Sequence, residues 1–67
     1  MAITLKAARI NRDMTQEAAA KELGITKGTL ASYESGKTIP KISMAKKIAR
    51  LYGLAVDDII FLPTDCA

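Results

Sequence analysis

The segment from Thr15 to Lys37 constrains the fold of this chain more than any other part of its 67 residues. Thr15 has the chemistry of a helix N-cap, because its hydroxyl can accept an otherwise unpaired backbone N–H. An apolar stripe at helical spacing follows, and Gly24 stands just past it, where glycine adopts a left-handed C-cap at the lowest cost. Thr26 offers a second N-cap, and the next helix stops near Gly36. The segment therefore predicts two short helices joined by a tight turn.

The second of these helices, at about residues 27–34, is unusually polar. Leu30 and Tyr33 are its only large apolar residues, whereas a helix that only packs should show a broad apolar face. A short surface helix that happens to be polar would have the same composition. The capped turn before it and the basic segment after it favour the layout of a DNA-binding helix-turn-helix, whose second helix enters a groove.

Four segments in order resemble the Xre-type, Cro/CI-like repressors, and small phage and prophage repressors most of all. They are LKAAR at 5–9, TQEAAAKELGI at 15–25, SYESGKTIP at 32–40 and LYGLAVDDII at 51–60. The resemblance spans about Leu5 to Phe61. It implies an all-α, compact five-helix, lambda-repressor-like domain with the helix-turn-helix at helices 2 and 3. It also implies binding to double-stranded operator DNA, usually as a homodimer.

The length and composition agree with a small helical domain. We expect one domain over residues 1–67, ordered from about 3 to 62, with 63–67 as a frayed tail. Aromatic residues are few, so aliphatic side chains must build the core. Because no alternating β-branched run is present, the sequence favours a helical bundle over a sheet.

The other helices are predicted from caps and apolar spacing. A first helix runs from Leu5 to about Arg12 with Thr4 as a possible N-cap, and a fourth runs from about Ile42 to Tyr52 and ends at Gly53. Lys41 cannot cap the fourth helix, so Ser43 is an alternative start. The expected buried stripe of this helix is Ile42, Ala45, Ile48, Ala49 and Tyr52.

A fifth, short helix is expected from near Val56. Asp57 and Asp58 would lie in its first turn, where negative charge suits the helix dipole, and Pro63 would end it.

Charge is unevenly distributed along the chain. Residues 27–50 carry six cationic side chains against Glu34, whereas residues 51–67 carry three acidic residues and no cation. The basic block coincides with the polar helix and the segment after it, which is where DNA phosphates would lie. We expect Lys37 and Lys41 to contact phosphate, and Lys46 and Lys47 to form the solvated face of a helix.

The start of the polar helix provides the expected base contacts, since the N-terminal residues of such a helix meet base edges in the major groove. These residues are Lys27, Gly28, Thr29 and Ser32. Gly28 either allows close approach to DNA or makes no contact with a base. The expected contacts to the DNA backbone are Gln16, Thr26, Ser35, Lys37, Thr38 and Lys41; for Gln16 this follows from the resemblance.

The resemblance also implies a partly buried ion pair between Arg9 and Glu34; two unrelated surface charges are the alternative. For the homodimer, the apolar end of the domain is the best candidate, with Ile60, Phe61 and Leu62 as interface residues. These same residues could instead complete the core.

Enzymatic function is not expected. The chain has no histidine, and its one cysteine, Cys66, offers neither an internal disulfide nor a zinc site, so no cofactor or metal is predicted. No signal peptide or membrane span is expected, which predicts a cytoplasmic, nucleoid-associated protein.

Three functions stay open: a repressor, a restriction-modification controller of the same fold, and an antitoxin or other protein-binding module. An antirepressor is a possible protein partner. The chain could also be the N-terminal piece of a longer repressor.

Overall fold

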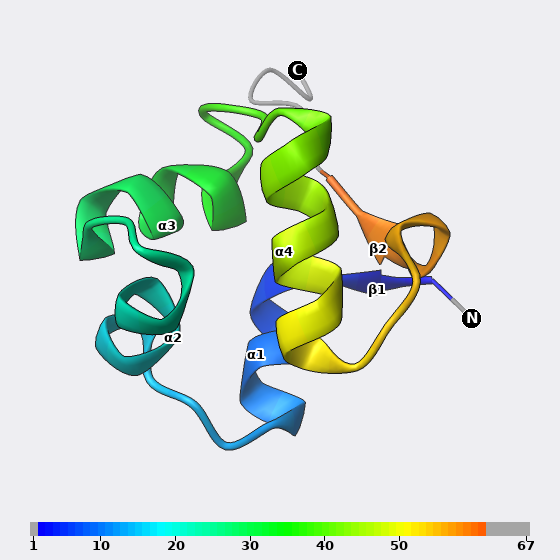
Figure 1. Cartoon of the computed structure of the whole chain (residues 1–67), viewed down its shortest axis with the longest axis horizontal. Coiled ribbons are helices and arrows are strands. Elements are labelled where there is room, and N and C mark those ends of the chain that lie inside the picture. The colour runs from blue at the N-terminus through cyan, green and yellow to red at the C-terminus, as the bar shows by residue number, and fades with distance from the viewer. Residues whose placement is uncertain (1, 62–67) are drawn as a thin grey trace.

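The computed structural model describes residues 2–61, and these form four α-helices, a single 3₁₀ turn and two short strands. In chain order they are β1 (Ile3–Thr4), α1 (Leu5–Asn11), α2 (Gln16–Leu23), α3 (Lys27–Ser35), α4 (Ile42–Tyr52), the 3₁₀ turn η1 (Val56–Asp58) and β2 (Ile59–Ile60). In Figure 1, α2 and α3 lie on one side of α4, and the two strands lie on the other. The small, mostly helical fold expected from the sequence is confirmed.

Threonine caps begin three of the helices. Thr4, Thr15 and Thr26 each accept a hydrogen bond from the backbone N–H three residues later, at 3.2, 3.0 and 3.1 Å. Gly24 ends α2 with a φ of 73°, a left-handed conformation that glycine adopts without a Cβ penalty. These short-range interactions fix the ends of α2 and the start of α3, so the predicted turn between the two helices is confirmed.

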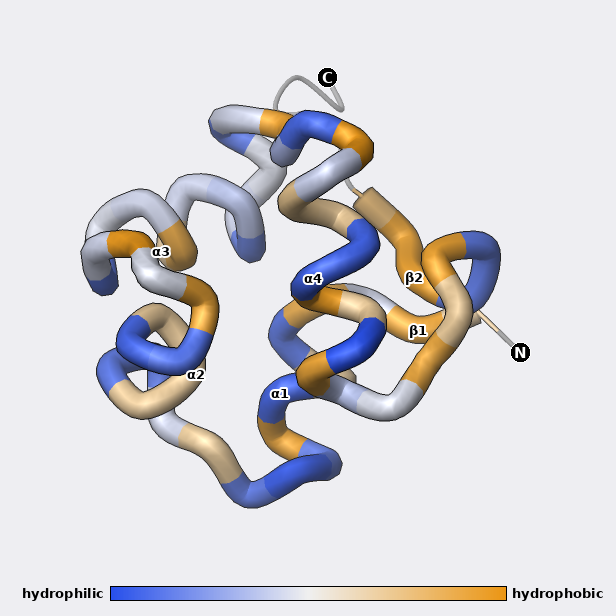
Figure 2. The backbone as a smooth tube through the Cα atoms, viewed as in Figure 1, coloured by the Kyte–Doolittle hydropathy of each residue, from blue (hydrophilic) through white to orange (hydrophobic). Residues whose placement is uncertain are grey.

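The core lies where the four helices meet. Leu5, Leu30 and Ile48 are its largest fully buried side chains. Ala19 and Ala20 of α2 are also buried, at 0 % and 2 % exposure, and their small size lets α2 pack closely against its neighbours. The remaining buried apolar residues are Ala8, Leu23, Ala45, Ala49, Tyr52 and Ile59. Figure 2 shows apolar residues distributed over every element around this centre.

Helix α4 begins where its apolar spacing predicts, at Ile42, with Lys41 in the N-cap position. The Lys41 side chain makes no capping hydrogen bond, but the alternative start with Ser43 as the cap is wrong. The prediction of Ile42 as a buried residue is also wrong, because its side chain is 65 % exposed. Met44 and Ala45 of the same turn do pack inward, so Ile42 lies on the solvent side of the first turn of α4.

The fifth helix expected from near Val56 is absent from the described residues. The 3₁₀ turn η1 stands there, closed by a 3.3 Å hydrogen bond from the Ala55 N–H to the Asp58 carboxylate. The chain then becomes extended, and β2 pairs in parallel with β1, so that Ile3 lies opposite Ile59. β-Branched isoleucines suit such a pairing, and Ile59 is buried by it. The all-α, five-helix prediction is therefore wrong at this end of the domain.

Candidate DNA-binding surface

The N-terminal half of α3 presents its polar side chains to solvent. Lys27 and Gly28 are exposed, whereas Thr29 and Ser32 are half-buried. The hydroxyl oxygens of Thr26 and Thr29 lie 2.8 Å apart, and the Thr26 oxygen also accepts the Thr29 backbone N–H. The cap thus fixes the orientation of the Thr29 side chain. All four predicted base-contacting residues lie on one helix, of which only Leu30 is buried.

The predicted DNA-backbone contacts lie on three segments around α3. Thr26 precedes α3, Ser35 ends it, and Lys37, Thr38 and Lys41 are exposed residues between α3 and α4. The Ser32 carbonyl oxygen accepts hydrogen bonds from the Ser35 hydroxyl at 3.2 Å and from the Thr38 N–H at 3.3 Å. The loop that carries the lysines is therefore held against the end of α3.

Gln16 belongs to the same predicted set but is half-buried at the start of α2. Its Nε2 atom donates a hydrogen bond to Glu34 Oε1 at 3.0 Å. An amide nitrogen has two hydrogens, so one remains for a second acceptor. This bond fixes the direction in which the second N–H can point.

The ion pair expected between Arg9 and Glu34 is present. Arg9 Nε lies 2.7 Å from Glu34 Oε2, and the two side chains are only 11 % and 5 % exposed. Arg9 also donates to Glu34 Oε1 at 3.3 Å and to the Met14 carbonyl oxygen at 2.8 Å. The hydrogen bond and charge of Glu34 raise the pKa of Arg9. Together with Gln16, this network joins α1, the start of α2 and the end of α3.

Tyr52 lies under this network as part of the core. Its hydroxyl is buried and has no hydrogen-bond partner among the described residues. Burial raises the pKa of Tyr52 to about 12; the negative charge of Glu34 adds to the rise and Arg9 opposes it. The hydroxyl is thus neutral in the folded protein and contributes packing rather than a hydrogen bond.

Gly28 is not required by the fold. A Cβ built there would have one neighbour within 4 Å, the Thr26 hydroxyl oxygen at 4.0 Å. Within residues 2–61, Gly24, Gly36 and Gly53 are the glycines with a positive φ, whereas Gly28 lies inside α3. Steric packing within the described residues therefore gives no reason for glycine at this exposed position.

A hollow of about 320 Å³ opens between α1 and the predicted DNA-binding helices. Its lining residues are Lys6, Gln16, Ala31, Glu34 and Ser35. The sequence interpretation did not assign a role to Lys6. The signal available in the sequence was its position one turn before Arg9 on α1, since residues three apart share a helix face.

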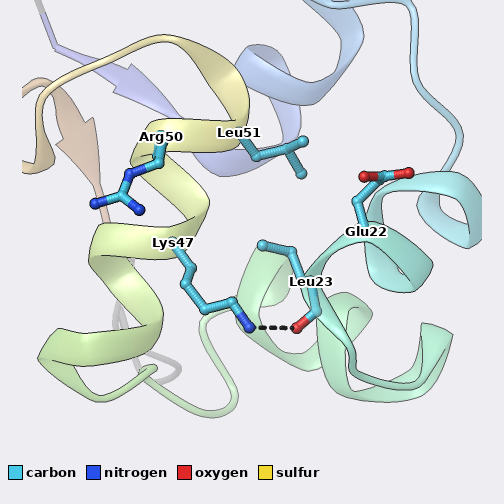
Figure 3. Close-up of a pocket in the computed structure, with 5 residues that line it drawn as sticks. All are labelled: Glu22, Leu23, Lys47, Arg50 and Leu51. Atoms are coloured by element: carbon cyan, nitrogen blue, oxygen red, sulfur yellow. Dashed lines mark hydrogen bonds between the residues drawn. The ribbon is translucent and has the colours of Figure 1, made fainter.

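Lys47 has a structural contact that the sequence did not predict. Its Nζ donates a hydrogen bond to the Leu23 carbonyl oxygen at 3.3 Å, so a cation of α4 satisfies the C-terminus of α2 (Figure 3). The bond crosses a second hollow, of about 210 Å³, whose other lining residues are Glu22, Arg50 and Leu51. Lys47 is still exposed, as expected for a solvated face, but it also holds α2 to α4.

The three predicted dimer-interface residues have different environments. Ile60 is 38 % exposed on β2, whereas Phe61 is half-buried against the core. Leu62 lies outside the described residues.

Metal-binding clusters and membrane-spanning helices are both absent from the described part of the chain. Residues 2–61 contain no group of three acidic, histidine or cysteine side chains placed to hold a metal ion. No helix described here is long and apolar enough to cross a bilayer.

Comparison with known proteins shows relatives across most of the domain. An uncharacterised HTH-type transcriptional regulator of Methanocaldococcus jannaschii is 38 % identical over 91 % of this chain and 92 % of its own length. A similar regulator of Archaeoglobus fulgidus is 37 % identical over 88 % of this chain and 83 % of its own length. The cryptic phage CTXphi transcriptional repressor RstR of Vibrio cholerae is 35 % identical over 78 % of this chain, but over only 47 % of its own length.

No solved structure matches the chain significantly. The model of the family described as Helix-turn-helix matches residues 5–59, which covers all four α-helices and the turn between α2 and α3. The chain therefore belongs to the helix-turn-helix family of DNA-binding transcriptional regulators.

Proposed function

We propose that this protein is a sequence-specific operator-binding regulator of the phage-repressor or Cro-like type, with α3 in the major groove. The composition of α3 carries the proposal. This nine-residue helix buries Leu30 alone, while Lys27, Gly28, Thr29 and Ser32 remain available at its surface. The similarity to a protein named a phage transcriptional repressor supports the repressor type.

In this proposal Lys27 donates to guanine O6 or N7, and Thr29 and Ser32 exchange hydrogen bonds with base edges. Contacts to phosphates come from Gln16, Thr26, Ser35, Lys37, Thr38 and Lys41. The Arg9–Glu34–Gln16 network supports these roles, because it holds the start of α2 and the end of α3 in a fixed relation. Regulation then follows from occupation of a promoter, and the protein works in the cytoplasm with the nucleoid.

Two copies would bind one operator. A single domain of this size contacts one half-site, and paired half-sites lie about 34 Å apart, one turn of DNA. Ile60 supports an interface at the strands, because it is exposed at 38 % and the two-stranded sheet leaves β2 a second edge within the described residues. Phe61 and Leu62 would extend that surface. An antirepressor could release the operator by binding the same protein.

Selection of bound duplexes from a random DNA library tests this function. The selection should be run near physiological salt, where non-specific binding is weak. We expect an inverted repeat whose half-sites are about one turn, roughly 10 base pairs, apart. Recovery of no motif, with only salt-sensitive binding, would contradict the proposal and favour a protein-binding module such as an antitoxin.

A further inference from the structure

The hollow beside the predicted DNA-binding helices has a lining whose chemistry suits an anion. It opens between α1, the first residue of α2 and the end of α3, with a volume of about 320 Å³. Gln16 and Ser35 line it, and both are predicted to touch the DNA backbone. The hollow therefore lies on the side of the domain that would face phosphates.

Lys6 decides the charge of this hollow. Of the five lining residues, Lys6 is the cation and Glu34 is the anion. The Glu34 carboxylate is already neutralised by Arg9, at 2.7 Å, and accepts a further hydrogen bond from Gln16. The exposed Lys6 ammonium is thus the one unpaired charge among the five lining residues, and it would attract an anion.

Hydrogen-bond donors accompany that charge. Gln16 Nε2 uses one hydrogen on Glu34 and keeps the other. Because the network holds the amide in place, this second N–H is oriented before any ligand arrives. An ammonium and an amide N–H at one small, open hollow are the donors that a phosphate oxygen accepts.

We propose that Lys6 binds a DNA backbone phosphate in this hollow, together with Gln16, and so extends the protein–DNA contact from the helix-turn-helix onto α1. The proposal rests on the proposed function and adds to it a residue outside the predicted contact set. Ala31 keeps the space open, because its methyl group is the smallest side chain in the lining. A larger residue at position 31 would fill the volume that the phosphate needs.

Binding of labelled duplexes over a series of salt concentrations tests the role of Lys6. Lys6→Ala is compared with Lys21→Ala, which removes the same charge from an exposed helical position that lines neither hollow. A selected operator and a random duplex of equal length are the probes. The binding constant K falls as salt rises, and loss of one phosphate contact should make the slope of log K against log salt less steep by about 0.9.

We expect that change of slope for Lys6→Ala on both duplexes, whereas Lys21→Ala and Lys6→Arg should keep the wild-type slope. Equal slopes for Lys6→Ala, Lys21→Ala and wild type would overturn the inference and leave the proposed function standing. If the wild-type protein binds neither duplex, the inference about Lys6 and the proposed function are both contradicted. Urea unfolding of Lys6→Ala should match wild type, since Lys6 is exposed.

Ala31→Leu tests whether the phosphate lies inside the hollow. With the hollow filled, adding Lys6→Ala should cause no further change of slope. If Lys6→Ala lowers the slope equally in the Ala31→Leu and wild-type backgrounds, Lys6 meets its phosphate elsewhere and the assignment to the hollow is wrong.

Discussion

Arg9 Nε lies 2.7 Å from Glu34 Oε2, and this contact joins residues 25 positions apart, on α1 and on the last turn of α3. The same carboxylate accepts the Gln16 amide at the start of α2. One buried acid thereby sets the relative positions of three helices. The orientation of α3 relative to α1 and α2 therefore depends on the Glu34 carboxylate.

Removing the acid should destabilise the fold strongly. Glu34→Gln leaves the Arg9 guanidinium buried without a counter-charge, which typically costs on the order of 3 kcal/mol. Urea unfolding at neutral pH measures this cost. Glu22→Gln, at an exposed position on α2, is the matched control and should change stability by less than about 0.5 kcal/mol. A Glu34→Gln effect no larger than that of Glu22→Gln would contradict the importance of the pair.

Tyr52→Phe should leave the free energy of unfolding unchanged at neutral pH or raise it by up to about 1 kcal/mol, because the buried hydroxyl has no partner in the described structure. The two proteins should differ in alkali. The pKa of Tyr52 is raised to about 12 in the fold, against about 10 for an exposed tyrosine. The unfolded chain therefore loses its proton first, and wild-type stability falls between about pH 10 and 12.

Urea midpoints measured across that pH range check the prediction for Tyr52. Every other side chain is the same in the two proteins, so the difference between wild type and Tyr52→Phe isolates Tyr52. That difference should move in favour of the phenylalanine variant as pH rises. Parallel pH profiles would show that Tyr52 ionises as an exposed tyrosine does.

Gly28→Ala separates the two interpretations of this glycine. The structure leaves room for the methyl group, so the change should stabilise α3 by up to about 1 kcal/mol. Thermal unfolding measures that gain. If operator affinity then falls, the glycine allows close approach of the α3 backbone to DNA; if affinity is kept, position 28 contacts no base. A loss of stability would contradict the open surroundings of Gly28.

Alanine substitutions of Lys27 and Lys37 should affect DNA binding in different ways. Lys27→Ala should weaken operator binding by about 1–3 kcal/mol and relax the preference at one base position. Lys37→Ala should weaken the operator and random DNA alike, because a phosphate contact carries no sequence information. Binding to single-base operator variants measures both. Equal effects of the two substitutions on all duplexes would remove Lys27 from the base-contacting set.

Ile60→Asp tests the interface proposed for the homodimer. Ile60 is exposed on β2, so a charge there should weaken association of two copies more than it destabilises the monomer fold. Sedimentation and binding to a two-half-site operator report association, and urea unfolding reports the fold. Phe61→Asp is the comparison, and it should affect folding more because Phe61 packs against the core. Unchanged association in Ile60→Asp would place the interface elsewhere.

The sequence by itself determined the local structure of this protein. Thr15, Gly24 and Thr26 act on groups within a few residues, so the ends of α2 and the start of α3 could be predicted from neighbours alone. The apolar spacing of α4 is equally local, and it gave the correct bounds of that helix. The candidate contacts on α3 followed from the same helix register.

The tertiary structure decided what depends on distant parts of the chain. The isoleucines after η1 became a strand because β1, more than 50 residues earlier, offers them backbone partners. Ile42 has the spacing of a core residue but is exposed, whereas Met44 and Ala45 of the same turn pack inward, because the placement of the other elements decides which side of that turn is covered. Lys6 and Gln16 meet at one hollow only because α1 packs beside α2 and α3. Periodicity and capping describe a single helix, whereas a shared hollow and a strand pairing require the relative positions of several elements.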